Sequence, residues 1–234
     1  MRLINKGGEG AMMITKKCCI CGYEFAFDNE LRTNLYISKK NNGATGYFNL
    51  WHYFVEQCPH CGYASQDISR TQNKSIVKSK SYKLDNPDII EKLDEARPNM
   101  VSTYLMAEKY YDSIGDEVNR AKCLFQAADL VYAEIMYWEE YIFDGVGNDL
   151  RKDMQYVQFE TFAEELYDKG LKVLAEHIKE HPEDIDSRIL HAGICSDGSS
   201  VQKIQGISEL RALEKDAKLT TLQKDMVEYL LKDL

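Results

Sequence analysis

The sequence has little that would keep it unfolded. Only four of its 234 residues are proline, and no low-complexity block is present. Chains that bury too little apolar surface stay disordered, but here 44% of the residues are hydrophobic and 29% are charged, as in ordinary globular proteins. A chain of this length can bury a core without disulfide bonds. We therefore expect an ordered protein.

Long apolar runs are also lacking. The N-terminal residues MRLINKGGEGAMMITKK hold no stretch long enough for a signal peptide, and no later segment approaches the roughly 20 apolar residues of a membrane-spanning helix. The seven cysteines are odd in number and unevenly spaced, unlike the paired cysteines of small secreted domains. We expect a reducing, cytoplasmic location and no membrane partner.

Residues 1–13 are interpreted as an N-terminal tail. The stretch KGGE (residues 6–9) can be encoded as AAA GGA GGT GAA, which contains a bacterial ribosome-binding sequence just upstream of Met12 and Met13. One hypothesis is that translation starts at one of these methionines rather than at Met1, so that residues 1–11 are leader read as protein. A flexible glycine-rich tail is the alternative.

Acidic residues are scarce in the first third of the chain. Residues 1–80 contain 11 basic and 6 acidic residues, a net charge of +5, whereas residues 81–234 contain 18 and 32, a net charge of −14. The change indicates a domain boundary. The acidic part is poorly suited to nucleic acid, and the basic part falls short of a continuous basic surface.

The motif Cys-x-x-Cys-Gly-Tyr occurs twice, as CCICGY and CPHCGY, with 36 residues between the two cysteine pairs. Two such chelates supply four thiolates for a tetrahedral zinc ion, and the glycine after each pair lets the backbone N–H groups turn toward the sulfurs. The following tyrosine can cover the metal. We predict one structural zinc ion per chain, held by Cys18, Cys21, Cys58 and Cys61.

Other interpretations of the cysteines are weaker. A redox dithiol normally uses a single Cys-x-x-Cys at the start of a helix, and an iron–sulfur cluster also takes four thiolates. Cys19 would break the matched register of the two motifs, so it is interpreted as a non-ligand. His52 and His60 lie near enough in sequence to substitute for a cysteine, but four sulfurs already complete the coordination shell.

The pattern of the chain changes from strand-like to helical. Residues 14–65 alternate like short strands, and residues 66–83 form a polar connector with one further candidate strand, SIVKS. From Pro87 onward the apolar spacing is helical. We therefore predict a mainly α protein in which a small β-rich zinc-ribbon-like module and its connector (14–83) precede an array of α-helical hairpins (84–234). Helices are expected over 86–96, 97–114, 117–143, 150–181, 183–195, 200–216 and 220–234.

The first helical hairpin is similar to a tetratricopeptide repeat, although its second helix is shifted by one residue from the usual spacing. The residues that carry this similarity are Tyr104, Ala107, Tyr111, Gly115, Asp116, Ala121, Phe125 and Ala128. Successive hairpins of this size are typical of a solenoid, whose concave surface binds proteins or peptides.

One short motif suggests hydrolysis. The segment HIKEH (residues 177–181) matches the inverted zinc-protease pattern His-x-x-Glu-His. Pro182 follows at once, however, and no third ligand is evident. No glycine-rich phosphate loop, nucleophile elbow or ordered Ser/His/Asp set occurs, so the sequence does not predict an enzyme.

With these motifs identified, the chain resembles a bacterial family known as domain of unknown function 2225. The resemblance rests on CCICGYEF, CPHCGYAS and AEKYYDSIGDEVNRAKCLFQAA, and it covers roughly residues 14–180. Cys19 stands where the family has a proline. The resemblance implies a metal site and helical repeats, and it implies no particular activity.

Three functions remain open at this point. The first is a non-catalytic interaction or scaffold protein, in which the helical surface binds an unknown protein or peptide partner. The second is a nucleic-acid-associated regulator that acts through the zinc-ribbon module. The third, with the least support, is a thiol redox or hydrolytic enzyme.

Overall fold

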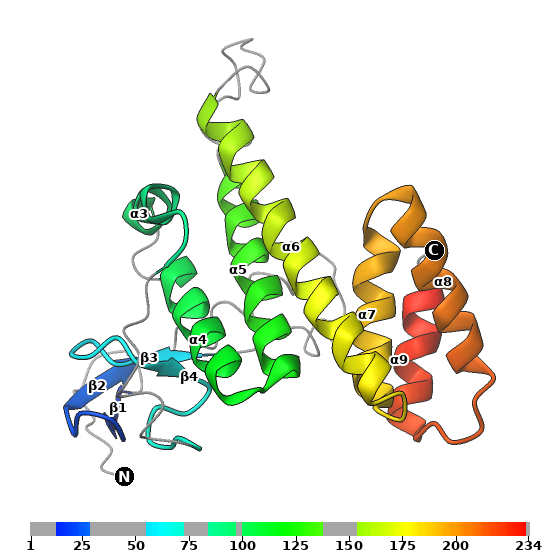
Figure 1. Ribbon diagram of the computed structural model, residues 1–234, viewed down its shortest axis with the longest axis horizontal. Coiled ribbons are helices and arrows are strands. Elements are labelled where there is room, and N and C mark those ends of the chain that lie inside the picture. The colour runs from blue at the N-terminus through cyan, green and yellow to red at the C-terminus, as the bar shows by residue number, and fades with distance from the viewer. Residues whose placement is uncertain (1–12, 29–54, 73–83, 97–99, 138–153, 233–234) are drawn as a thin grey trace.

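The computed structural model describes residues 13–28, 55–72, 84–96, 100–137 and 154–232 (Figure 1). Within these ranges the protein is mainly α-helical with a small N-terminal strand region, which confirms the predicted fold class. The candidate strand SIVKS lies outside the described residues, as do residues 1–12 of the N-terminal tail and residues 138–153.

Two short antiparallel hairpins form the strand region. Strand β1 (Met13–Lys17) pairs with β2 (Glu24–Asp28), and β3 (Glu56–Gln57) pairs with β4 (Ala64–Ser65). Each hairpin encloses one Cys-x-x-Cys motif between its strands. The repeated sequence motif therefore corresponds to a repeated strand–turn–strand unit.

The helices follow in chain order and lie close to the predicted ranges. They are α3 (Pro87–Ala96), α4 (Met100–Ile114), α5 (Glu117–Tyr137), α6 (Met154–Glu180), α7 (Ile185–Asp197), α8 (Ser200–Glu214) and α9 (Thr221–Lys232). The helix that was expected to continue to residue 143 is described only as far as Tyr137.

Local capping explains where several helices begin. Asp184 accepts a hydrogen bond from the N–H of Ser187 at the start of α7. At the start of α9, Thr220 and Gln223 form a reciprocal capping box, in which each side chain accepts from the other residue's backbone N–H. Such caps satisfy N–H groups that have no partner within the helix.

The turn between α4 and α5 also follows from its sequence. Gly115 has φ +71°, a left-handed conformation that glycine adopts without steric cost. Asp116 then accepts the N–H of Asn119 at 3.1 Å and so caps α5. The Gly-Asp pair thus ends one helix and starts the next, as the predicted helical hairpin requires.

Small residues allow the helices to approach closely. Ala121, Ala127 and Ala128 of α5 are fully buried. Gly170 of α6 faces the ring of Phe125, and a Cβ atom at Gly170 would lie 2.5 Å from that ring. Each helix from α4 to α9 packs against the next one in the chain, and α5 and α6 form the longest contact (Figure 1).

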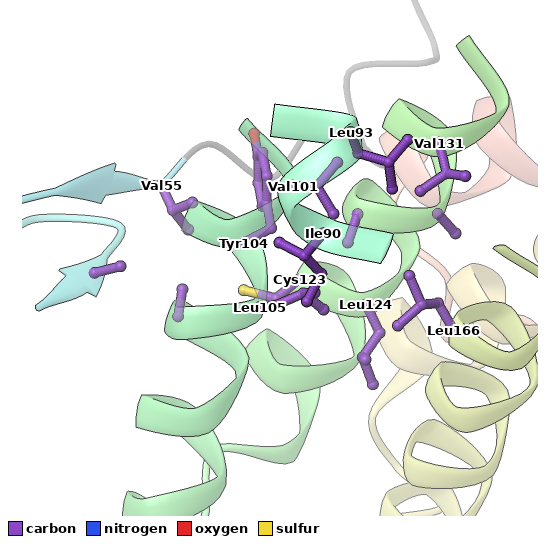
Figure 2. Packing of buried hydrophobic residues seen from close by; sticks show 14 of the residues in the cluster. Val55, Ile90, Leu93, Val101, Tyr104, Leu105, Cys123, Leu124, Val131 and Leu166 are labelled. Carbon is purple, nitrogen blue, oxygen red and sulfur yellow. The ribbon is translucent and has the colours of Figure 1, made fainter. Parts of the chain in front are cut away.

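The largest buried cluster spans the strand region and the first helices. Val55 beside β3 belongs to the same cluster as Val101 and Tyr104 of α4, Ile90 of α3 and Leu124 of α5 (Figure 2). The second cysteine motif is therefore packed against α4. The helices α7, α8 and α9 share a separate cluster that includes Ile189, Leu210 and Val227.

Candidate metal centre

The two cysteine motifs have the same backbone geometry. In the first, the N–H of Cys18 donates to the carbonyl of Tyr23 and the N–H of Gly22 donates to the carbonyl of Cys18, both at 2.9 Å. The second motif repeats both bonds at 2.8 and 2.9 Å from the equivalent residues. Gly22 and Gly62 have φ values of +78° and +72°, which glycine favours. The matched register predicted from the sequence is thus present in the fold.

The folding of these motifs brings the four predicted cysteines together. The sulfur of Cys18 lies 3.7 Å from that of Cys61, and the sulfur of Cys21 lies 3.7 Å from that of Cys58. All four sulfurs lie within 4.8 Å of one another. A disulfide requires about 2.05 Å between sulfurs, so these are separate thiols arranged around a common point.

These distances match a single tetrahedral metal ion. Four sulfurs that each lie about 2.3 Å from a zinc ion are separated from one another by about 3.8 Å. The space within the group fits one ion and is too small for several irons with their bridging sulfides. The four cysteines could therefore hold a metal ion, and the chemistry of the donor set is that of structural zinc sites.

The four thiols differ in exposure. Cys18 and Cys58 are buried, with exposed fractions of 1% and 0%, whereas Cys21 and Cys61 are exposed. Burial opposes ionisation of Cys21, but the N–H of Tyr23, the ring of His60 and the neighbouring thiols outweigh it and lower the pKa of Cys21 to about 6. At Cys18, burial prevails and raises the pKa. Metal binding displaces thiol protons, so it weakens as the pH falls.

The two tyrosines of the repeated motif have different surroundings. Tyr23 is 45% exposed, and its ring stacks on that of His60 with centroids 5.2 Å apart. Tyr63 is buried and packs edge-on against Tyr110 of α4 with centroids 5.0 Å apart. Tyr23 therefore lies at the surface beside His60, whereas Tyr63 anchors the second motif to α4.

Besides the stacking of Tyr23 on His60, two further contacts join the first hairpin to the second hairpin and to the residues that follow it. Lys16 of β1 forms an ion pair with the buried carboxylate of Glu56 in β3. The N–H of Cys19 donates to the carbonyl of Ile68 at 2.9 Å. These contacts hold the two halves of the cysteine cluster in register independently of the sulfurs.

The second hairpin and the residues after it are hydrogen-bonded to α4. The hydroxyl of Thr103 donates to the side chain of Gln57 at 3.0 Å, and the hydroxyl of Tyr111 accepts the N–H of Gln66 at 3.0 Å. Tyr110 accepts the N–H of Gln72 at 3.3 Å. The four-cysteine cluster is therefore attached to α4 through the second hairpin, a relationship that sequence spacing alone does not reveal.

The alternative ligands occupy other positions. Cys19 is half-buried, and neither Cys19 nor His60 belongs to the group of close ligand atoms. His52 lies outside the described residues. Among the described residues, the four cysteines are the only group of three or more potential ligands close enough together to hold a metal ion.

The histidines of the HIKEH segment have structural partners. His177 lies 3.0 Å from Asp184, which caps α7, and 3.5 Å from Glu117 of α5. His181 lies 3.6 Å from Glu183. His177 therefore connects three helix ends, and its contacts account for it without a catalytic metal.

The two remaining cysteines are buried in the helices. Cys123 is fully buried and Cys195 is 3% exposed. Burial raises the pKa of both thiols, which disfavours the reactive thiolate. Both therefore behave as small apolar side chains.

Comparison of the chain with known proteins identifies no relative. No helix in the described part of the chain is long and apolar enough to cross a membrane. No family model, curated protein or solved structure matches the chain. The resemblance to domain of unknown function 2225 therefore stays a prediction.

Proposed function

We propose that this protein is a non-catalytic, cytoplasmic interaction or scaffold protein, in which a structural zinc ion holds the N-terminal module against a helical array that binds a protein partner. The observation that carries the proposal is the group of four sulfurs within 4.8 Å of one another, joined to α4 through the second hairpin. Four thiolates leave a zinc ion no open position for substrate or water.

The role of the metal follows from the size of the hairpins. β3 and β4 are two residues long, and isolated hairpins of this kind are marginal in water. A zinc ion would add folding free energy to such a segment. Its main effect would be to present α3 and α4 in a fixed position.

Contact with nucleic acid receives less support from the described residues. Within 13–28 and 55–72 the basic side chains are Lys16, Lys17 and Arg70, and each pairs with a carboxylate of the same module. Paired charges release few counterions from a phosphate backbone. We therefore favour a protein partner.

The first test is the metal content of purified, untagged protein together with the double variant Cys58→Ser/Cys61→Ser. We expect about one zinc ion per chain in the wild type and loss of that ion, with loss of solubility, in the variant. Cys123→Ser/Cys195→Ser removes two cysteines outside the cluster and is the matched control, which should keep its metal.

The competing result is equally clear. Metal-free protein with two reactive dithiols would contradict a structural zinc site and would direct work to the reduction potential of the cysteine pairs. Zinc that exchanges readily with added ligand and supports hydrolysis of a test ester would contradict a closed, non-catalytic site.

A further inference from the structure

A pocket of about 630 Å³ lies where α6 meets α7 and the start of α8. Its volume is within the range of sites that bind small molecules or side chains. Tyr132 of α5 and Tyr167 of α6 contribute two rings whose centroids lie 6.0 Å apart. Leu171 and Ile194 add apolar surface. We call this the α6–α8 pocket.

The polar lining of the α6–α8 pocket is acidic. Glu164, Asp168 and Asp197 contribute carboxylates, and none of the three forms an ion pair with another residue in the described ranges. Gln202 donates weakly to Asp168 at 3.5 Å. No lysine or arginine lines the pocket. A bound cation would therefore meet exposed carboxylates and no competing basic side chain within the lining.

The electrostatic environment agrees with this. Burial, followed by the charges of Glu164, Glu160 and Asp168, raises the pKa of Tyr132. Burial also raises the pKa of Asp197, and the charge of Lys203 partly opposes this. The carboxylates around Tyr132 give this part of the pocket a negative potential, in which a positive group would be favoured. Tyrosine ring faces attract ammonium and guanidinium groups for the same electrostatic reason.

Two exposed apolar side chains lie on α8, the helix whose start lines the pocket. Val201 and Ile204 are 68% and 70% exposed, which makes them the most exposed large apolar side chains of the described residues. They are three positions apart and so share one face of α8, within the same turn of the helix as the pocket residue Gln202.

We propose that the α6–α8 pocket receives a lysine or arginine side chain of a protein partner, whose neighbouring apolar residue packs on Val201 and Ile204. The cation would lie against the tyrosine rings with the carboxylates around it. This inference rests on the proposed function, and it specifies the chemistry of the partner: a segment that pairs a basic residue with an apolar one, attracted by the acidic helical region.

The test is selection of binders from a random twelve-residue peptide library displayed on phage, with the full-length protein immobilised. We expect selected peptides to be enriched in lysine or arginine next to an apolar residue. The variant Glu164→Gln/Asp168→Asn/Asp197→Asn should lose this selection. The variant Glu176→Gln/Glu214→Gln/Glu228→Gln removes the same number of exposed charges outside the pocket lining and should keep it.

Binding of a synthetic selected peptide, measured by fluorescence anisotropy, gives the magnitude. Loss of one charge-assisted contact in Asp197→Asn should weaken the peptide about tenfold, and circular dichroism verifies that each variant is folded. The proposal would be overturned if the selected peptides lacked basic residues, if no peptide were selected, or if both triple variants weakened peptide binding equally. It would also be overturned if the pocket bound free spermidine, a simple polyamine cation, but no peptide.

A separate measurement distinguishes this proposal from the proposed function. Partners cross-linked to the wild type in native cells are compared with those of the pocket variant. If both capture the same proteins, the pocket proposal is wrong while the interaction role stands. If the wild type captures none, the interaction role fails as well.

Discussion

Cys18 and Cys19 are adjacent thiols, but only Cys18 lies within the metal-binding group. Cys18→Ser removes a predicted ligand. We expect it to lower metal affinity by more than roughly 10–100-fold, which is the loss when only a residue that hydrogen-bonds to a ligand is removed. Cys19→Ser should keep the metal, because the Cys19 thiol lies outside that group and its backbone N–H bond to Ile68 does not involve the side chain. Competition with a chromophoric zinc chelator measures both affinities, and a larger loss in Cys19→Ser would show that the register is wrong.

A buried carboxylate joins three helices. Glu108 of α4 is 1% exposed and contacts Arg120 of α5 at 2.9 Å and Lys169 of α6 at 3.1 Å. Glu108→Gln keeps the shape of the side chain but removes the carboxylate that Arg120 and Lys169 share. We expect about 2–3 kcal/mol of lost unfolding free energy, below the full cost of breaking a buried pair because both cations are partly exposed and Arg120 keeps Asp112. Urea denaturation measures this.

The same arginine supplies the control for that experiment. Arg120 also pairs with Asp112, which is half-exposed, at 2.8 Å. Asp112→Asn should cost less than about 1 kcal/mol, as exposed ion pairs do. If the two variants had the same unfolding free energy, the buried Glu108 contacts would contribute no more to stability than the exposed Asp112 pair.

At the scale of residues, the features that could be predicted from the sequence are those that depend on local spacing. The grouping of the four cysteines was predictable because the two members of each pair lie within four residues and the glycine after them fixes the turn. Glu108 was not predicted, since its value depends on two cations that other helices bring to it. The unlike surroundings of Tyr23 and Tyr63 were hidden for the same reason, because only one motif faces α4.

The elements themselves were largely predictable, because caps and breakers are local. The helix expected over 150–181 is described over Met154–Glu180, and the Gly115–Asp116 turn ends α4 as expected. The packing of the second hairpin on α4 was not predicted. It depends on Tyr63 and Tyr110 meeting in space, and no spacing rule connects residues that far apart in the chain.

The contact between α7 and α8 depends on one glycine. A Cβ atom at Gly206 would lie 2.4 Å from the carbonyl oxygen of Ala192 and 2.7 Å from the N–H nitrogen of Ser196. Glycine to alanine in a helix normally gains about 1 kcal/mol, but here backbone must move. We expect Gly206→Ala to lower the melting temperature, with a net loss of about 1–3 kcal/mol.

A second glycine provides the comparison. At Gly198 a Cβ atom would meet the flexible side chain of Gln202 at 2.6 Å, and its φ of −83° suits alanine. Gly198→Ala should therefore change the melting temperature little. Thermal unfolding of both variants tests the pair, and a stable Gly206→Ala would mean that α7 and α8 are less closely packed than described.

At the scale of the whole molecule, the buried clusters divide the chain differently from its sequence composition. The change in charge near residue 80 separates the cysteine module from the helices, whereas one buried cluster contains Cys58, Tyr63, Tyr104 and Leu124 together. The helices α7 to α9 have their own cluster. Loss of metal should therefore affect α4 as well as the hairpins, and should spare the C-terminal helices.

Hydrogen exchange with and without a zinc chelator tests this division. On metal removal we expect amides of β3, β4 and α4 to lose at least about tenfold in protection, because the hairpin that covers α4 no longer has its metal. Amides of α8 and α9 should be unchanged and serve as the internal control. Unchanged protection in α4 would mean that the module folds and unfolds independently of the helices, and uniform loss throughout the chain would mean that the protein unfolds as a single cooperative unit.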